Sequence, residues 1–313
     1  NAVLRHAIRE ADYDPASEIQ DTLERLAIET SHPVWLIDRW SRSFGLAEAE
    51  SFARANNEIP PTSFRVVHTI ANEDEILQQL TAAGASIERS AIAEHAFRIS
   101  GAGSVLRELA ANGLIYLQDE ASQLVAETLE ARAGDRVLDL CAAPGGKTTL
   151  LAARAGDNAL IIAADVSPAR MTTINTTVAL QQLHSIKPVL LDARHKLPFA
   201  PESFDRVLVD APCSGTGTLR RNPEIRWRLT NEDIPNFGAA QKQFLRNAAE
   251  VVKAGGRLVY STCSVELEEN EEVVEDFLQT HPEFTQLRMV RTWPHREGSD
   301  GFYMAVLEHR SGR

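Results

Sequence analysis

The fold of this chain is decided by one stretch, Val137-Leu138-Asp139-Leu140-Cys141-Ala142-Ala143-Pro144-Gly145-Gly146-Lys147-Thr148. It begins as a short apolar run typical of a buried strand and continues into a glycine turn that opens a helix. Four similar apolar runs follow, at residues 160–165, 188–192, 207–210 and 258–260. Nearly continuous apolar strands separated by helical stretches indicate a parallel sheet covered on both faces. From about residue 119 the sequence therefore predicts a doubly wound α/β fold.

Two smaller regions precede this sheet. Apolar residues recur at near-helical spacing up to about residue 58, and Pro60-Pro61 then breaks the pattern. The segment from there to about 118 combines an extended run at 64–67, a helix through Ile76 and Leu80 with Gly84 as its C-cap, and short strands. We expect a small α+β module there.

Composition limits the function classes. Among 313 residues, 44 are Asp or Glu and 32 are Lys or Arg, a net charge of −12 that argues against a general nucleic-acid coat but allows a local basic groove.

No apolar run reaches membrane-spanning length, and the first residues carry no signal peptide. Because the chain does not begin with Met, we expect it to start inside a longer product. Three cysteines are too few for a disulfide framework or a zinc cluster, which predicts a cytoplasmic protein without a metal site.

Four of the predicted strands carry an aspartate as their last residue or, for the first strand, one residue before it, namely Asp139, Asp165, Asp192 and Asp210. Ligands of open α/β sheets bind beyond the carboxyl ends of the strands. A single aspartate there is explained equally well as a helix cap. Four in successive strands favour a ligand crevice whose carboxylates accept hydrogen bonds from hydroxyl and amino groups.

The turn after the first strand excludes two familiar nucleotide sites. A P-loop needs glycine six positions before its lysine, where this chain has Cys141, and the G-x-G-x-x-G fingerprint is also missing. A nucleoside ligand without a triphosphate remains, and Asp165 follows Gly145 by 20 residues, the spacing of a ribose-binding acid. S-adenosylmethionine, an adenosine joined to a sulfonium, fits this turn.

Two of the cysteines follow predicted strands directly. Cys213 lies in Asp210-Ala211-Pro212-Cys213-Ser214-Gly215, and Cys263 lies in Ser261-Thr262-Cys263-Ser264. Either one alone is explained by an inert buried thiol. Together they would project into the crevice, where a thiol acts as a nucleophile or an acid–base group. Two thiols beside a methyl donor indicate methylation of an unactivated carbon.

These motifs resemble those of the bacterial 16S ribosomal RNA cytosine carbon-5 methyltransferases called RsmB, Fmu or Sun. The resemblance covers essentially the whole chain, and its most specific carriers are D-x-C-A-A-P-G-G-K-T and D-A-P-C-S-G-T-G with T-C-S behind them. Further matching segments are residues 117–122, 137–148, 210–227, 260–270 and 300–303. One departure is Arg65-Val66-Val67-His68, because the family usually has Asn after R-V.

The resemblance implies three parts. Residues 1–28 would be the remnant of a NusB-like helical domain, with Asn1 to Arg5 as part of its last helix. Residues 29–118 would be a helical linker and a small α+β RNA-binding module. Residues 119–313 would form the catalytic domain, a Rossmann-like class I S-adenosylmethionine methyltransferase sheet. We expect a monomer.

The resemblance also implies a mechanism. Cys263 would attack carbon 6 of the cytosine, Cys213 would assist product release, Asp210 would hydrogen-bond the base near its ring nitrogen 3, and Lys147 would orient it. The two cysteine roles are reversed in the alternative, since DNA cytosine methyltransferases use a P-C thiol as nucleophile. The expected cofactor contacts are Cys141, Ala142, Ala143, Pro144, Gly145, Gly146, Lys147, Asp165, Asp192 and Asp210.

Two charged segments flank these motifs. Arg220, Arg221, Arg226 and Arg228 are expected to bind RNA phosphates, with the neighbouring Trp227 interpreted as structural. The alternative is a solvated basic helix start. The acidic run is interpreted as helix N-terminal charge and a solvated face, and comprises Glu266, Glu268, Glu269, Glu271 and Glu272.

Small-subunit ribosomal RNA is the favoured substrate. Two alternatives stay open: a tRNA substrate with the same chemistry, or a catalytically idle RNA-binding assembly factor.

Overall fold

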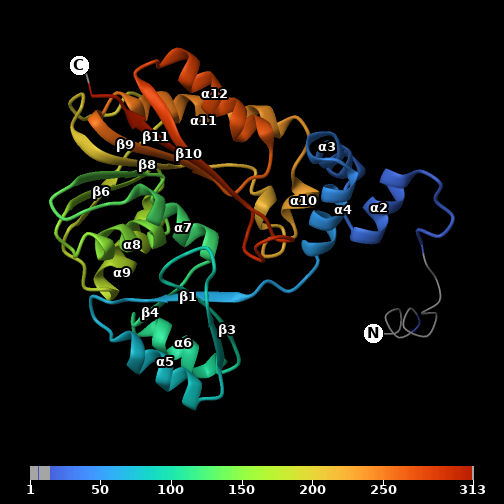
Figure 1. The fold of residues 1–313 in the computed structure, drawn as a ribbon, viewed down its shortest axis with the longest axis horizontal. Helices are drawn as coiled ribbons and strands as arrows, with labels where there is room; N and C mark the ends of the chain where they lie inside the picture. The colour runs from blue at the N-terminus through green and yellow to red at the C-terminus, as the bar shows by residue number, and fades with distance from the viewer. Residues whose placement is uncertain (1–5, 7–14, 312–313) are drawn as a thin grey trace.

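A computed structural model describes residue 6 and residues 15–311 of the chain (Figure 1). Its largest part is a seven-stranded sheet with the strand order β10-β11-β9-β8-β5-β6-β7. The strands are β5 (Arg136–Leu140), β6 (Leu160–Asp165), β7 (Ile186–Leu190), β8 (Phe204–Asp210), β9 (Val252–Thr262), β10 (Phe284–Thr292) and β11 (Phe302–His309). The predicted doubly wound α/β architecture is confirmed.

The sheet is mixed, whereas the sequence predicted parallel strands. The five strands from β9 to β7 pair in parallel, but β11 runs antiparallel to both β9 and β10. Residues 293–301 alone connect β10 to β11. So short a connection leaves no room for a crossover helix, and the two strands pair as an antiparallel hairpin.

Helices cover both faces of this sheet, as Figure 1 shows. One layer contains α7 (Glu120–Leu129), α8 (Gly146–Arg154) and α9 (Pro168–Leu180), and the other contains α11 (Asp233–Ala249) and α12 (Glu271–Thr280). Strand residues alternate between the two cores: Val137 packs in the first, while Leu138 packs in the second. Ser167 caps α9 and Pro168 occupies its first turn, as the sequence predicted.

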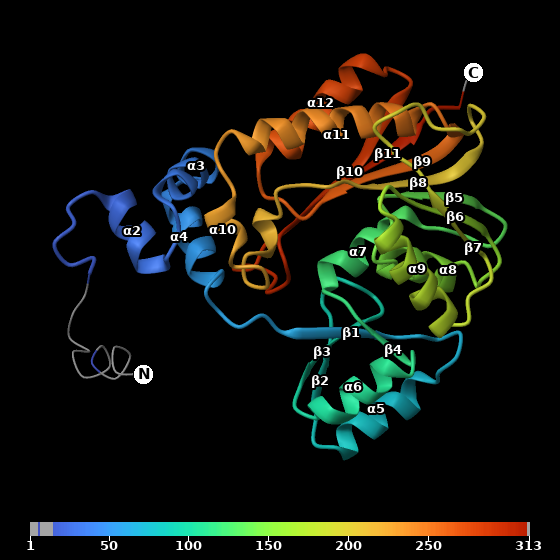
Figure 2. The same cartoon turned by 180° about the vertical axis from the view of Figure 1, so that it is seen from behind.

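A smaller lobe below the large domain confirms the predicted α+β module (Figure 2). Its antiparallel sheet has the order β2-β3-β1-β4. The elements are β1 (Thr62–Val66), α5 (Glu73–Ala82), β2 (Ser86–Arg89), β3 (Ala96–Ser100), α6 (Gly103–Ala111) and β4 (Ile115–Leu117). Gly84 ends α5 with φ of +86°, a left-handed conformation that favours glycine.

Three N-terminal helices pack against the large domain. They are α2 (Thr22–Thr30), α3 (Val34–Phe44) and α4 (Leu46–Ala55). Trp40 is fully buried and meets Phe52 edge-to-face, with 4.6 Å between the ring centroids. Leu219, Val265 and Trp293 of the large domain belong to the same apolar cluster, so these helices share a core with it. The expected helix at Asn1 to Arg5 lies outside the described residues.

Short helical segments carry the loops beyond β8 and β9. They are η1 (Thr216–Thr218), α10 (Ile225–Arg228) and η2 (Leu267–Glu269). Within the described part of the chain, no helix has the length and apolar character needed to cross a membrane.

Candidate functional site

The predicted cofactor residues gather at the carboxyl ends of β5, β6 and β8. A cavity of about 140 Å³ is lined by the turn after β5, together with Asp139 and Asp210. A second cavity, of about 60 Å³, is lined by Asp165 and Asp192 with the apolar side chains of Val166 and Phe244. Cys141 lines both cavities. Residues that the sequence analysis assigned to one ligand thus border two cavities that share Cys141, together called the crevice.

The glycine turn is held in a fixed shape by backbone hydrogen bonds. The Ala142 N–H donates to the Ala164 carbonyl at 2.8 Å, which ties the turn to β6. The Gly145 N–H donates to the Ala142 carbonyl at 2.8 Å, which closes the turn just before α8. Gly145 has φ of +104°, a conformation that disfavours any residue with a Cβ.

Asp139 provides the test of whether this crevice fits a cationic cofactor. Its Oδ2 accepts a hydrogen bond from the Thr148 hydroxyl at 2.6 Å. Its Oδ1 is buried and has no partner among the described residues, although Asp139 lines the turn cavity. Burial raises the pKa of Asp139 to about 7. An unpartnered carboxylate oxygen suits the positively charged methionine part of S-adenosylmethionine, so the residues present fit that cofactor.

Two further aspartates line the second cavity of the crevice. Asp165 accepts hydrogen bonds from the backbone of Ser167 at 2.9 Å and of Ala143 at 3.3 Å, which joins β6 to the turn. Asp192 is held by Arg194, whose side chain and backbone hydrogen bonds lower the Asp192 pKa to about 2. Asp192 therefore stays ionised, with its carboxylate beside the second cavity.

Lys147 and Asp210 form an ion pair inside the crevice. Lys147 Nζ lies 2.7 Å from Asp210 Oδ2, and the Ser261 hydroxyl donates to Asp210 Oδ1 at 2.7 Å. Burial acts to lower the pKa of Lys147, but the Asp210 carboxylate outweighs it and raises that pKa above its ordinary value. Lys147 Nζ also lies 5.2 Å from the centroid of the Phe302 ring. The ammonium group is thus fixed between a carboxylate and an aromatic face.

The two predicted catalytic thiols meet beside this ion pair. Cys213 Sγ and Cys263 Sγ lie 3.3 Å apart. The pKa of Cys213 is raised well above its ordinary value, mainly by the hydrogen bond with Cys263 and next by burial. Cys263 lines a cavity of about 570 Å³ together with Phe302 and Pro144. Cys213 is therefore neutral and lies next to Cys263. The cavity that Cys263 lines is large enough for a nucleobase.

Comparison with known proteins now decides the family. A family model described as "16S rRNA methyltransferase RsmB/F" matches residues 126–308, more than half of the chain. The chain belongs to the RsmB/F family of 16S rRNA methyltransferases. A second model, for the ferredoxin-like domain of RsmF/B-like methyltransferases, matches residues 32–106. The crevice is accordingly the site of an S-adenosylmethionine-dependent enzyme.

Individual relatives agree with the family models. The chain is 34% identical to the probable ribosomal RNA small subunit methyltransferase B of Bacillus subtilis over 99% of this chain and 73% of that protein. It is also 34% identical to ribosomal RNA small subunit methyltransferase B of Yersinia pseudotuberculosis over 92% of this chain and 69% of the relative.

Solved structures share the fold. The crystal structure of PH0851 has a TM-score of 0.88 at 36% identity and covers 95% of this chain and 70% of its own. A methyltransferase homolog protein from Pyrococcus horikoshii has a TM-score of 0.80 at 26% identity, covering 93% of this chain and 99% of its own.

The basic segment of this methyltransferase differs from its predicted role in RNA binding. Arg226 is only 4% exposed, and its guanidinium donates to backbone carbonyls of the N-terminal helices and to Asn57 Oδ1 at 2.9 Å. Arg220 is buried against Asp300 and the Gly298 carbonyl. The prediction of phosphate binding is therefore wrong for Arg220 and Arg226, because internal acceptors already satisfy them.

The other members of that segment remain accessible. Arg221 is one-third exposed and lines the Cys263 cavity, but it pairs with Asp300 at 2.8 Å and Asp119 at 2.9 Å. Arg228 is exposed, and its side chain makes no ion pair or hydrogen bond with any described residue. Trp227 is 64% exposed, so its interpretation as a structural residue is wrong.

The acidic run confirms one part of its interpretation and contradicts the other, because Glu271 and Glu272 do lie in the first turn of α12. Glu266 and Glu269 are buried, and Glu266 accepts hydrogen bonds from Arg39 Nε at 2.6 Å and Trp40 Nε1 at 3.0 Å. Glu268 pairs with Arg39 as well, and Glu271 pairs with Arg291 at 2.5 Å. Four of the five glutamates thus bind neighbouring elements, and only Glu272 is exposed, so the prediction of a solvated face is wrong for the run as a whole.

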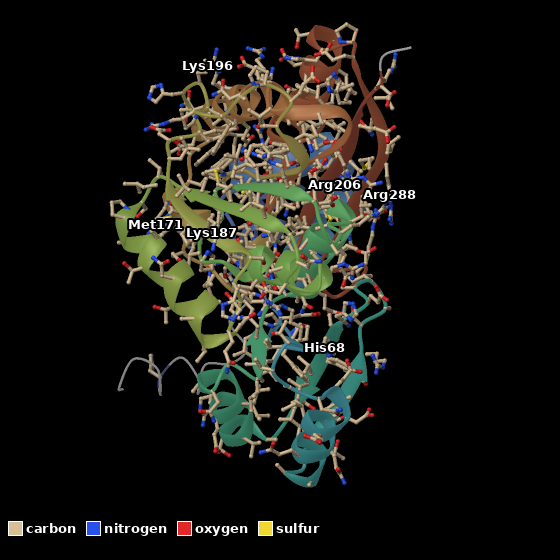
Figure 3. The ribbon with its side chains drawn as sticks, turned by 90° about the vertical axis from the view of Figure 1, so that its left-hand side faces the viewer. His68, Met171, Lys187, Lys196, Arg206 and Arg288 are labelled. Atoms are coloured by element: carbon tan, nitrogen blue, oxygen red, sulfur yellow. The ribbon has the colours of Figure 1, made fainter. Side chains whose placement is uncertain are left out.

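The small lobe supplies part of the site that the sequence analysis missed. Tyr116, Leu117 and Gln118 line the turn cavity from β4 and the residue after it. Arg65 of β1 is fully buried; it stacks on Tyr116, 5.1 Å from the ring centroid, and donates to Thr149 Oγ1 at 2.7 Å. Figure 3 labels His68 near this junction of the two parts. Residues 117–122 were among the segments that carry the family resemblance. That match was the signal in the sequence that this part of the chain lines the turn cavity.

Proposed function

We propose that this methyltransferase transfers a methyl group to carbon 5 of a cytosine in 16S rRNA through a covalent bond between Cys263 Sγ and carbon 6. The observation that carries the proposal is the pair of thiols 3.3 Å apart, one of them lining a nucleobase-sized cavity next to the cofactor crevice. Methylation of oxygen or nitrogen needs no such pair.

The chemistry follows from the weak nucleophilicity of cytosine carbon 5. Addition of the Cys263 thiolate to carbon 6 breaks the 5,6 double bond and makes carbon 5 an enamine carbon. The bound cofactor supplies an electrophilic methyl group on its sulfonium. After the new carbon–carbon bond has formed, a base removes the carbon-5 proton, the electron pair restores the double bond, and the sulfur–carbon bond breaks to release the thiolate.

The surrounding residues support distinct roles. Asp210 and Lys147 hold opposite charges 2.7 Å apart where the base would enter, so they can orient and polarise the ring during addition. Cys213, kept neutral by its raised pKa, is unsuited to attack but suited to assist proton transfer and product release. Cys263 lines the nucleobase-sized cavity, and this position favours it as the nucleophile.

Trapping on RNA that contains 5-fluorocytosine tests the covalent step. Fluorine at carbon 5 cannot leave as a cation, so the covalent adduct persists after methylation. We expect an adduct that survives denaturing electrophoresis for the native chain and for Cys213→Ala, and none for Cys263→Ala. An adduct with Cys263→Ala would overturn the assignment.

Bisulfite sequencing of cellular RNA, with and without the gene, tests the substrate. We expect one or more methylcytosines to disappear from small-subunit rRNA when the gene is absent. Loss confined to tRNA would replace the rRNA proposal with the tRNA alternative.

A further inference from the structure

Glu269 is a buried carboxylate to which the proposed chemistry assigns no role. It ends η2 and its side chain is 0% exposed. Its Oε2 accepts hydrogen bonds from the Ser214 N–H at 2.9 Å and from Gln241 Nε2 at 2.9 Å. Its Oε1 accepts from the Ser214 and Ser264 hydroxyls, the latter at 2.7 Å. All the donors are neutral, and Glu269 forms no ion pair with the described residues.

Those donors belong to the two thiol loops. Ser214 follows Cys213 directly, and Ser264 follows Cys263 directly. The two hydroxyls also meet each other at 3.0 Å. One carboxylate thus contacts the residue next to each thiol, although the two cysteines lie 50 positions apart in the chain.

Further contacts hold Glu269 itself in place. Gln241 of α11 donates to the Pro212 carbonyl at 2.9 Å as well as to Glu269. Hydrogen bonds therefore hold the residue before Cys213 and the residue after it. The Tyr260 hydroxyl, within β9, donates to the Glu269 backbone carbonyl at 2.5 Å. A carboxylate anchored by a helix and a strand is rigid enough to position what binds to it.

We propose that Glu269 is a positioning residue for the methyl transfer: its carboxylate binds the Cys213 and Cys263 loops together and sets the distance between the two thiols. This inference rests on the proposed function for its catalytic meaning, since Glu269 acts through the thiols and touches neither substrate nor cofactor. The negative charge of Glu269 adds to the causes that keep Cys213 protonated.

Disulfide trapping measures the thiol distance without RNA or cofactor. A diazene oxidant such as diamide takes two electrons and two protons from Cys213 and Cys263, forms the sulfur–sulfur bond, and is reduced to the hydrazine. In the full-length native chain we expect rapid loss of two free thiols. In Glu269→Ala we expect this rate to fall at least about tenfold, because the two loops are no longer held at reacting distance.

Two variants separate positioning from other effects. Glu269→Gln keeps the size of the side chain but not its charge. Its amide oxygen can accept from the Ser214 N–H and Gln241 Nε2, and its amide N–H groups can donate to the two serine hydroxyls, so its trapping rate should stay within about threefold of the native rate. Glu266→Gln is the matched control: it alters another buried glutamate in the same segment, whose side chain binds Arg39 and Trp40 instead of the thiol loops. It should trap at the native rate.

Binding of the cofactor analogue sinefungin shows whether a variant is folded. If Glu269→Ala binds the analogue but forms the disulfide at the native rate, the inference is wrong. Should Glu269→Ala fail to fold, Ser264→Ala removes one of the clamping hydroxyls and should slow trapping on its own; a native rate there overturns the inference. A chain that traps as expected but leaves RNA unmethylated would instead contradict the proposed function.

Methyl-transfer kinetics supply the link to catalysis. Glu269→Ala should lower kcat with little change in the KM for RNA, and Glu269→Gln should restore most of kcat. Equal loss in both variants would contradict a positioning role that depends on hydrogen bonding.

Discussion

Lys147 Nζ and Asp210 Oδ2 lie 2.7 Å apart, although one residue lies in the first turn of α8 and the other ends β8. Both side chains are largely withdrawn from solvent. A buried charge is costly unless it is paired, and the Asp210 carboxylate raises the pKa of Lys147. The pair thereby keeps the Lys147 ammonium charged inside the crevice.

Replacing Asp210 should disable catalysis more than folding. In Asp210→Asn the Lys147 ammonium loses its carboxylate partner, and we expect kcat to fall by about 10² or more, the range for loss of a positioned acid–base or electrostatic group. Transfer of a tritiated methyl group to RNA measures the effect. Asp205→Asn is the control, because Asp205 pairs with Lys253 at 2.6 Å at the opposite end of the same strand. Equal loss in both variants would contradict a specific role for Asp210.

Replacing Cys213 should slow the release of product. In Cys213→Ser we expect a covalent enzyme–RNA complex to accumulate on ordinary cytosine RNA, because the thiol that assists release is gone. Denaturing gel electrophoresis detects the complex. Cys141→Ser controls for general effects of thiol loss and should not trap RNA. If Cys213→Ser turns over without any complex, Cys213 has no part in release.

The buried carboxyl group of Asp139 should make stability depend on pH. Its folded pKa of about 7 exceeds the ordinary value of 3.8, so the folded chain holds this proton more tightly than the unfolded chain. The stabilisation is present below about pH 4 and is lost as the pH rises to about 7. Its upper size is about 4 kcal/mol, at about 1.4 kcal/mol per pKa unit. Urea unfolding measures the free energy of unfolding between pH 4 and 8, and this free energy should depend less on pH in Asp139→Asn than in the native chain. An unchanged dependence on pH would contradict the raised pKa of Asp139.

Arg226 should matter for stability. Its guanidinium joins α10 to the carbonyls of Thr30, Ser31 and Asn56. Arg226→Ala leaves these acceptors unsatisfied, and we expect a loss of about 2–4 kcal/mol in the free energy of unfolding. Urea denaturation measures it. A loss below about 0.5 kcal/mol, the range of ordinary surface substitutions, would contradict this structural role.

Arg228 should contribute to RNA affinity instead. Its exposed side chain has no partner among the described residues, and it follows the exposed Trp227. Arg228→Ala should weaken RNA binding and reduce the slope of log affinity against log salt by about 1, as expected for one lost phosphate contact. Fluorescence anisotropy at several salt concentrations provides the measurement. The control is Arg42→Ala, an exposed arginine that pairs with Asp38 within α3; an equal change there would mean that only overall charge matters.

Local sequence was sufficient to predict the five parallel strands and the core of the site. Apolar runs indicate these strands, and Gly145 in the turn after the first of them has φ of +104°, a conformation that favours glycine. The cysteines follow strand ends, and strand ends of a parallel sheet meet at one edge. The convergence of Cys213, Cys263, Asp210 and Lys147 could therefore be expected from their positions alone.

Tertiary structure decided which charged residues serve the site and which serve the fold. Glu269 and Arg226 look like surface residues in the sequence, yet both are buried. Partners far along the chain satisfy them: Gln241 lies 28 positions from Glu269, and Thr30 lies 196 positions from Arg226. Helical or strand periodicity reports only neighbours along the chain, whereas the cost of burying a polar group is removed by acceptors and donors that folding brings from elsewhere. The sequence by itself determined where the thiols lie along the chain; packing decided what holds them together.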